Sequence, residues 1–296
     1  MTALDETSIA PARRATWLMR NASVRRYPLL ILGVGMVAVI VVIALLSPWI
    51  APYPGDAASV TNPSALLMPP SSAHWFGTDL VGRDIFTRVI VGSRVSLGIA
   101  AFVLVVAAVV GLAVGLVAGF FGGKIDTILM RITDVFLAFP ALLLAVALAA
   151  VLNASAFHAA IAIAVTWWPW YARLSRGQAA SIRRQGYSDA ARVIGASRTR
   201  QVVRHVLPNA ATTVFVQISL DAAGIIVTAA TLSYLGLGAQ DPTPEWGLMV
   251  SQGQSLSTTA WWVVTFPGLA IVLTAIAFNF LGDGLQNKFD PKRGQR

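Results

Sequence analysis

The stretch LLILGVGMVAVIVVIALL, residues 29–46, contains no charged side chain and no polar one. A helix that crosses a bilayer needs about 20 mostly apolar residues, because hydrocarbon offers no partner for an unpaired backbone group. The stretch is long for a signal peptide, and SPWIAPYP, which follows it, lacks a small-x-small cleavage site. We therefore interpret it as a retained membrane anchor, which places the chain among membrane proteins.

The composition extends this interpretation to the whole chain. Of 296 residues, 56% are hydrophobic and 12% are charged, whereas a soluble domain has roughly 25% charged residues. Five further apolar segments are interpreted as spans, at residues 95–121, 135–152, 156–170, 211–235 and 261–280. The predicted fold class is an all-α membrane protein with six transmembrane helices, and no polar interval is long enough for a useful soluble domain.

The positions of Lys and Arg predict the orientation. Only Arg83, Arg88 and Arg94 of the 22 basic residues fall in the predicted outer loops, and cytoplasmic loops are the ones rich in Lys and Arg. Both termini are therefore expected in the cytoplasm, and the net charge of +9 reflects topology, not nucleic-acid binding. The predicted membrane domain is residues 29–284, between a cytoplasmic N-terminal segment (1–28) and a cytoplasmic tail (285–296). It contains two outer loops (47–94 and 237–260) and one cytoplasmic loop (173–209). The first segment is either an interfacial helix or a disordered basic leader.

Groups that would support catalysis are missing from the sequence. There is no cysteine, no H-E-x-x-H, no G-x-S-x-G, and the three histidines do not cluster. The phosphate-binding pattern G-x-x-x-x-G-K-[ST] is also absent. An intramembrane enzyme is therefore disfavoured, no catalytic, cofactor or metal site is predicted, and energy for transport would come from an ion gradient or a partner.

Asp221 is the one acid well inside a predicted span. A charged Asp at the centre of a lone helix costs about 2.5–3.5 kcal/mol on insertion scales, so its side chain is expected to face protein or a water-filled path. Two roles stay open: a hydrogen bond to a neighbouring helix, and a part in a transport pathway. A secondary ion-coupled carrier that uses Asp221 is therefore an alternative function.

Glycine, proline and tryptophan suggest how the spans pack. Gly111, Gly115 and Gly119 are four residues apart, and glycines at this spacing let a second helix approach closely. Pro140 and the proline of WWPWY, residues 167–171, are expected to kink or end their helices. The aromatic residues of WWPWY suit a belt at the membrane interface better than a substrate site.

The predicted cytoplasmic loop contains YSDAARVIGASRTRQVVRHVLPN, residues 187–209. Ser188 is a good N-cap, and Asp189 would lie in the first turn, where the helix dipole favours a carboxylate. Gly195 is the residue expected where that helix ends. The residues that would share one thin face of the helix are Ala190, Ala191 and Ile194.

A second short helix is expected directly after the first. Ser197 can cap it, its valines form an apolar strip, and Pro208 is expected to end it. A thin helix with a tight turn at its end and arginines around it could enter a groove on another protein. The pattern resembles the EAA loop of ABC importer permeases, E-A-A-x-x-x-G followed by x9 and I-x-L-P. The matching positions are Asp189, Ala190, Ala191, Gly195, Leu207 and Pro208, with Asp189 in place of Glu and His205 in place of Ile.

Two further stretches narrow the resemblance. HWFGTDLVGRDIFTRVIVGSRVSLGIA, residues 74–100, and LSYLGLGAQDPTPEWG, residues 232–247, resemble signatures of the C-type permease subunit of dipeptide, oligopeptide and nickel importers. Within the first, Thr78 or Asp79 could cap a short helix, with Asp79 four residues before Arg83. The outer-loop signature residues are Gly77, Thr78, Asp79, Gly82, Arg83 and Asp84. Ala229 stands where many members have Glu.

The resemblance covers roughly residues 25–290 and implies a type I ABC importer permease in the bacterial inner membrane. It implies three kinds of protein partner besides lipid: a second, B-type permease subunit, two cytoplasmic ATPase subunits, and an extracytoplasmic substrate-binding protein. ATP and Mg would be bound by the ATPases, and residues 188–195 would form the coupling helix in an ATPase groove. Dipeptides or oligopeptides are the expected substrates, with nickel chelates and opine-like solutes as alternatives.

Overall fold

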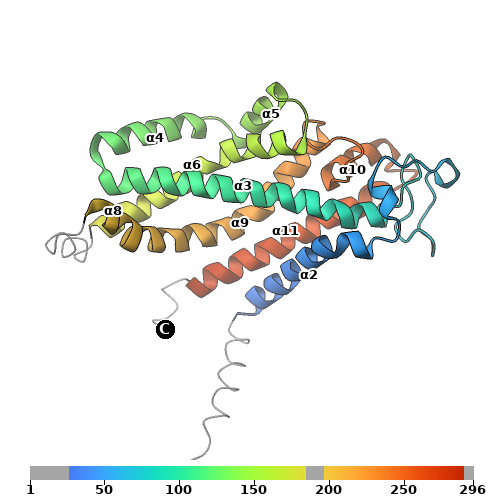
Figure 1. The fold of residues 1–296 in the computed structure, drawn as a ribbon, viewed down its shortest axis with the longest axis horizontal. Coiled ribbons are helices and arrows are strands. Elements are labelled where there is room, and N and C mark those ends of the chain that lie inside the picture. The colour runs from blue at the N-terminus through green and yellow to red at the C-terminus, as the bar shows by residue number, and fades with distance from the viewer. Residues whose placement is uncertain (1–26, 185–196, 290–296) are drawn as a thin grey trace, which may run out of the picture.

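A computed structural model describes residues 27–184 and 197–289 of the chain, and the described residues contain helices and no strand (Figure 1). The α-helices are α2 (Pro28–Ile50), α3 (Ile85–Phe121), α4 (Gly123–Leu137), α5 (Ala141–Val151), α6 (Ala156–Arg183), α8 (Arg198–Gln201), α9 (Leu207–Tyr234), α10 (Trp246–Gly253) and α11 (Trp262–Phe289). Short 3-10 turns occupy Pro54–Ala57, Pro63–Ala65 and Gln254–Leu256, and a π-turn occupies Val202–Val206.

Within residues 27–184 and 197–289, four helices are long and apolar enough to cross a membrane: α2, α3, the run Arg198–Tyr234 that ends in α9, and α11. A fifth span exists if α4 and α5, which meet at an angle of 84°, count as one broken span. The predicted span at 156–170 lies in α6, which is not among these helices. The structure thus supports an all-α membrane protein with four or five candidate spans.

The helix bounds differ from those of the predicted spans. The helix that contains the span predicted at 95–121 begins ten residues earlier, at Ile85. The span expected at 135–152 is divided between α4 and α5, and Pro140 is the residue before α5, as a helix-breaking proline should be. Pro169, by contrast, lies inside α6, which continues to Arg183.

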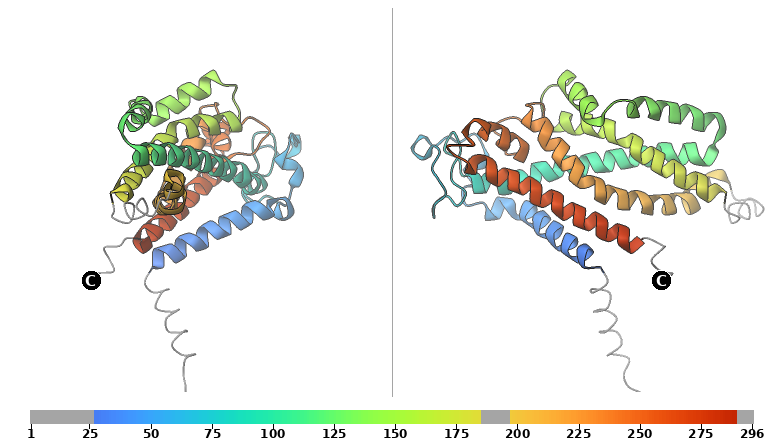
Figure 2. Two further views of the ribbon diagram at one scale, coloured as in Figure 1. Left: turned by 60° about the vertical axis from the view of Figure 1, so that its left-hand side comes forward. Right: turned by 180° about the vertical axis from the view of Figure 1, so that it is seen from behind.

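The core is built where α3, α6 and α9 pack together, with α5 against α6 (Figures 1 and 2). Val103 of α3, Ile163 of α6 and Ile225 of α9 are fully buried there. Outside this core, α2 packs along α11. The side chains of α2 that face away from α11 are exposed and apolar, which is the pattern of a helix in contact with lipid.

The glycine strip of α3 lies directly against α6. A Cβ atom added to Gly111 would lie 2.5 Å from the backbone oxygen of Trp168, and one added to Gly119 would lie 2.8 Å from the Cβ atom of Ala179. Both separations are shorter than van der Waals contact, so the two helices approach as closely as they do only because α3 carries no side chain at these positions.

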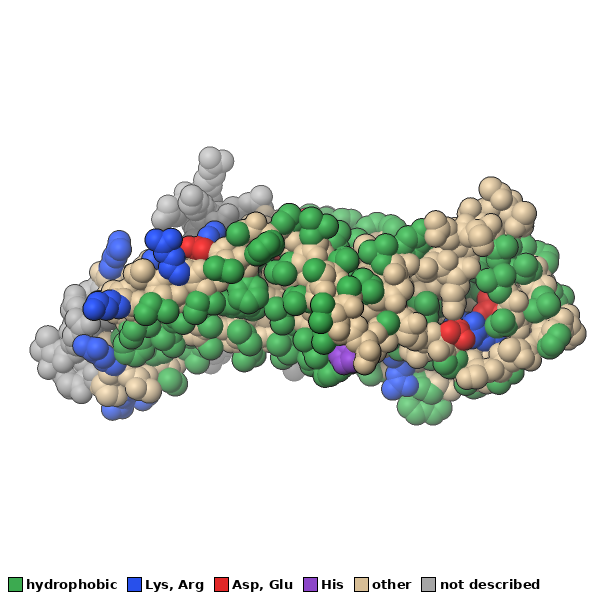
Figure 3. Space-filling model, turned by 90° about the horizontal axis from the view of Figure 1, so that it is seen from above, with side chains coloured by type: hydrophobic (Ala, Val, Ile, Leu, Met, Phe, Trp, Pro, Cys, Tyr) green, Lys and Arg blue, Asp and Glu red, His purple; other side chains and the backbone are tan. Residues whose placement is uncertain are grey.

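The two ends of the molecule differ in character. The segment 51–84 and α10 lie at one end, whereas α8 and the last turns of α6 lie at the other (Figures 1 and 2). Figure 3 shows Lys and Arg side chains gathered at the end with α8, and hydrophobic side chains across the middle. Two ion pairs attach α4 to α6 near the basic end, Arg176 to Asp126 at 2.6 Å and Arg173 to Asp134 at 2.7 Å.

Candidate functional site

The outer-loop signature forms a tight, glycine-dependent turn before α3. Gly77 and Gly82 have φ angles of 74° and 84°, a region that disfavours L side chains, and a Cβ atom on Gly77 would lie 2.6 Å from the backbone oxygen of Met68. Asp84 caps α3, because its carboxylate accepts the Thr87 N–H at 2.7 Å. The predicted cap at Thr78 or Asp79 was therefore wrong: Thr78 forms an isolated bridge with Asp84.

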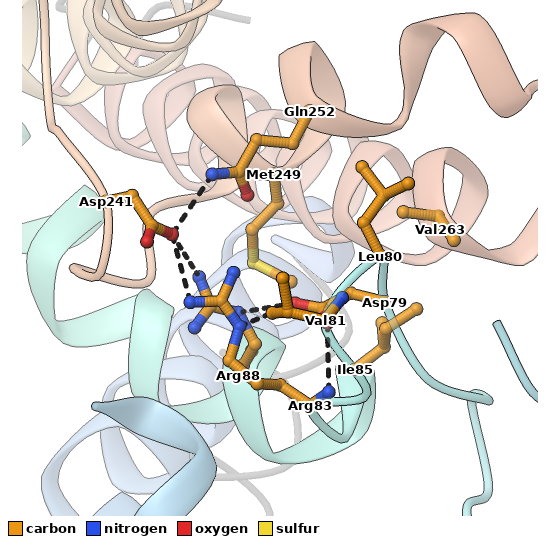
Figure 4. A pocket seen from close by; sticks show the side chains of 10 residues that line it. All are labelled: Asp79, Leu80, Val81, Arg83, Ile85, Arg88, Asp241, Met249, Gln252 and Val263. Carbon is orange, nitrogen blue, oxygen red and sulfur yellow. Dashed lines mark hydrogen bonds and ion pairs between the residues drawn. The ribbon is translucent and has the colours of Figure 1, made fainter. Parts of the chain in front are cut away.

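A cluster of charges, buried at Asp79, Arg83 and Arg88 and exposed at Asp241, connects this turn to the loop after α9 (Figure 4). The Asp79 carboxylate accepts the Arg83 side-chain Nε–H at 2.7 Å, so the predicted Asp79–Arg83 pair exists, although it is buried and not on an exposed helix. Arg83 Nη1 also donates to Asp241 at 2.9 Å, and Gln252 donates to the same Asp241 oxygen at 3.2 Å. Although partial burial opposes it, these hydrogen bonds hold the pKa of Asp241 below its ordinary value.

Arg88 completes the cluster and was not singled out from the sequence. Its side chain is 1% exposed, and its Nη1 donates to the backbone oxygens of Asp56 and Pro242 at 3.1 and 3.4 Å. Its Nη2 has no hydrogen-bond partner among the described residues. With Asp79, Arg83 and Asp241, Arg88 lines a cavity of about 160 Å³. Within this cluster two acids and two arginines balance in charge.

Glu245, in the second signature, connects α10 to α3. One carboxylate oxygen accepts the Leu248 N–H at 2.9 Å and thereby caps α10, and the other accepts the Ser96 hydroxyl at 3.1 Å. Burial raises the pKa of Glu245 above its ordinary value, against the hydrogen bonds it accepts. The sequence shows that Glu245 precedes a tryptophan and a glycine, but only the fold shows that Ser96 is its partner.

At the basic end, the residues predicted to couple to a partner lie largely outside the described residues. Ser188, Asp189, Ala190, Ala191, Ile194 and Gly195 all belong to that part of the chain. Ser197 caps α8 as predicted, because its hydroxyl accepts the Arg200 N–H at 3.3 Å. Pro208 does not end the second helix. It occupies the first turn of α9, where no N–H is required, after a π-turn in which the Leu207 N–H bonds to Val202.

Asp221 lies near the middle of α9, on a cleft between α9 and α6. The cleft has a volume of about 560 Å³, and its lining residues are Trp167, Trp170, Arg173, Leu174, Gln217 and Asp221. The Gln217 side chain donates to the Asp221 carboxylate at 3.0 Å. Tyr171 is fully buried beside Asp221, so the prediction that the whole WWPWY run forms an interfacial belt was wrong. Within the described residues, no three His, Asp or Glu side chains are grouped as a metal site would require.

Comparisons with known proteins identify the family of this all-helical chain. Residues 111–295 match the family of binding-protein-dependent transport system inner membrane components. The chain belongs to that family, and it is a multi-pass protein of the inner membrane that serves as a transport component.

Individual relatives cover nearly the full chain. The probable D,D-dipeptide transport system permease protein DdpC of Escherichia coli strain K12 is 42% identical, over 98% of this chain and 97% of its own length. The dipeptide transport system permease protein DppC of Alkalihalophilus pseudofirmus is 40% identical, over 97% and 91%. The glutathione transport system permease protein GsiD of Pectobacterium atrosepticum is 42% identical, over 86% and 84%.

Proposed function

We propose that this chain is the transmembrane permease subunit of an ATP-driven ABC importer for short peptides. The observation that carries the proposal is the coverage of the relatives: permease proteins for D,D-dipeptides, dipeptides and glutathione match from 86% to 98% of the chain at 40% identity or more. All three names describe small peptides, so peptides are favoured over nickel chelates or opine-like solutes. The same coverage disfavours an independent ion-coupled carrier.

The proposed topology has six spans and both termini in the cytoplasm, in the type I ABC importer fold. The α4–α5 pair would supply one span, and α6 another, with its apolar part in the bilayer and Arg173, Arg176 and Arg183 toward the cytoplasm. The gathering of Lys and Arg at one end of the molecule supports this orientation (Figure 3). The cluster of Asp79, Arg83, Arg88 and Asp241 would then face the extracytoplasmic side.

The proposed assembly pairs this chain with a B-type permease subunit, two cytoplasmic ATPases that bind ATP and Mg, and an extracytoplasmic binding protein. Residues 188–195 would enter the groove of one ATPase. The helices on either side of these residues support this placement. α6 ends and α8 begins at the basic end of the molecule, so the two ends of the connecting loop lie at the same end (Figure 1).

The test is reconstitution of the complete transporter in vesicles, with its binding protein and a radiolabelled dipeptide. Uptake is expected to require ATP on the side of the vesicle membrane that carries the ATPase subunits. Dissipating the ion gradients across the membrane is expected to leave uptake unchanged. Uptake driven by a gradient without ATP would refute the ATP-driven assignment.

The coupling loop is tested by Gly195→Trp, which is expected to abolish co-purification of the ATPase. The matched control is Gly177→Trp: Gly177 lies on α6, and an added Cβ there would meet nothing within 4 Å. If Gly195→Trp assembles and transports like the unmodified protein, residues 188–195 do not dock in the ATPase.

A further inference from the structure

The cleft beside Asp221 has the composition of a ligand site. Sites for small molecules have volumes of about 300–1,000 Å³ and mostly apolar walls with a few placed polar groups. This cleft measures about 560 Å³, its walls include the rings of Trp167 and Trp170, and Asp221 and Gln217 place polar atoms on the α9 side. Asp221 is the fifteenth residue of the 28-residue α9, so it lies well inside a helical run that is long and apolar enough to cross a membrane.

The Asp221 carboxylate has no cationic partner within the described part of the chain. Gln217 donates one hydrogen bond to it, and the Tyr171 hydroxyl lies close by without meeting hydrogen-bond geometry. Arg173 lines the same cleft, but its guanidinium is held by Asp134 at 2.7 Å. A carboxylate inside a membrane-spanning helix is costly unless a cation or several donors accompany it. The Gln217 amide, with the Tyr171 hydroxyl beside it, leaves about half of the roughly four acceptor positions of the carboxylate unused.

We propose that Asp221 binds the amino-terminal ammonium group of a peptide as the peptide passes through the transporter. An ammonium carries three donors and a positive charge, which match the lone pairs that Gln217 leaves on the carboxylate. Trp170 is 56% exposed, and its ring, with that of Trp167, offers a face on which a cation or an apolar side chain of the peptide can rest. The inference rests on the proposed importer function and names the substrate group that this site recognises.

A lysine or arginine of the second permease subunit is the rival occupant. The cleft favours a passing ligand, because a space of about 560 Å³ is far larger than one side chain requires, and because a permanently inserted cation would block it. The rival makes a different prediction, since removing the Asp221 charge would then weaken the association of the two permease subunits.

The first experiment compares Asp221→Asn with Asp221→Glu in the complete transporter, using dipeptide uptake, ATP hydrolysis and subunit co-purification. Asp221→Asn is expected to lower the uptake rate about tenfold, the effect of losing one charge-assisted hydrogen bond, and Asp221→Glu is expected to retain most of it. Both variants should assemble and hydrolyse ATP in response to the loaded binding protein. Unchanged uptake by Asp221→Asn overturns the proposal, as does loss of the second permease subunit from that variant. A failure of the importer function itself would instead abolish uptake in the unmodified protein.

The second experiment uses the absence of cysteine from this chain. Gln217→Cys places a thiol in the cleft one turn before Asp221. The complete complex is treated with a water-soluble methanethiosulfonate, this chain is then separated from its partners, and the extent of labelling is measured by mass spectrometry. Leu-Leu, supplied at high concentration to the nucleotide-free complex, is expected to slow the reaction several-fold, whereas N-acetylated Leu-Leu is not. Adding Asp221→Asn should remove the protection.

The matched control is Phe215→Cys, which replaces an apolar residue on a different face of α9 that is 56% exposed and does not line the cleft. Its labelling should not respond to either peptide. Equal protection of Gln217→Cys by the free and the acetylated peptide, or no protection by either, would show that Asp221 does not recognise the ammonium group.

Discussion

The close contact between α3 and α6 makes a sharp prediction for Gly115→Ala. The new Cβ atom would lie 2.7 Å from the backbone nitrogen of Arg176 and closer still to the backbone oxygen of Ala172 and the Ser175 hydroxyl. Two of these three atoms belong to the backbone of α6 and cannot rotate away. The helices must therefore separate along an interface that is the most extensive in the protein.

Gly98→Ala is the matched control, since Gly98 is on the same helix and an added Cβ there meets nothing within 4 Å. Both substitutions gain helix propensity, about 1 kcal/mol relative to glycine, so this gain cancels when the two are compared. The remaining difference is the overpacking cost, which runs from about 1 to 3 kcal/mol and is expected near its upper end because backbone atoms are in contact.

The assay is thermal unfolding in detergent at one scan rate, followed by near-ultraviolet circular dichroism. For a chain of this size each kcal/mol shifts the midpoint by about 2–4 °C, so Gly115→Ala should unfold roughly 6–12 °C below Gly98→Ala. Midpoints within about 1 °C of one another would show that the glycine strip does not determine how closely α3 and α6 pack.

Three further predictions concern the N-cap of α3 and the charge cluster of Asp79, Arg83, Arg88 and Asp241. Asp84→Ala removes the acceptor of the Thr87 N–H and should cost about 0.5–2 kcal/mol, whereas Asp84→Asn keeps an accepting oxygen and should unfold at a higher temperature than Asp84→Ala. Arg88→Met removes a cation that lies 3.7 Å from Asp79 and should lower the free energy of unfolding by about 3 kcal/mol. The measurement is the yield of monodisperse protein on size-exclusion chromatography, which should fall, and an undiminished yield would contradict this prediction. Because the pKa of Asp241 is lowered in the folded protein, its stabilising effect is present above about pH 4 and is lost as the pH falls through the folded value. Asp241→Asn should therefore reduce the acid dependence of the unfolding midpoint between pH 7 and pH 3.

The membrane class of the chain and the facing of its glycine strip could be predicted, because both depend on local patterns. An apolar run such as 29–46 needs no tertiary information, and the spacing of Gly111, Gly115 and Gly119 defines one helix face whatever the partner is. The Asp79–Arg83 pair also depends on local spacing. Its burial does not, and depends on residues more than 150 positions away, such as Asp241.

Long-range contacts explain the failures. Residues 85–94 carry two arginines and a serine, a composition that predicts a loop, but they form the first turns of α3, where Arg88 donates to the backbone oxygen of Pro242 and Val89 accepts from the Trp246 ring. The π-turn before Pro208 is equally hidden, because a proline is compatible with either a helix end or a helix start. Asp221 was recognised as unusual for its depth, whereas the cleft exists only because α6 brings Trp167 and Trp170 opposite it.

The position of that cleft gives the proposed coupling a physical basis. Its walls are α6 and α9, and residues 184–197 are the segment that connects α6 to α8 and the start of the α9 run. The run Arg198–Tyr234 contains 37 residues and, at 1.5 Å per residue, is about 55 Å long, so one helical run extends from the basic end past Asp221 toward the loop that holds Asp241. An ATPase that moved residues 188–195 would therefore act on both walls of the cleft at once. The relative position of Asp221 and Trp170 would then change with each ATPase cycle, and the affinity of the cleft for a peptide ammonium group would change with it.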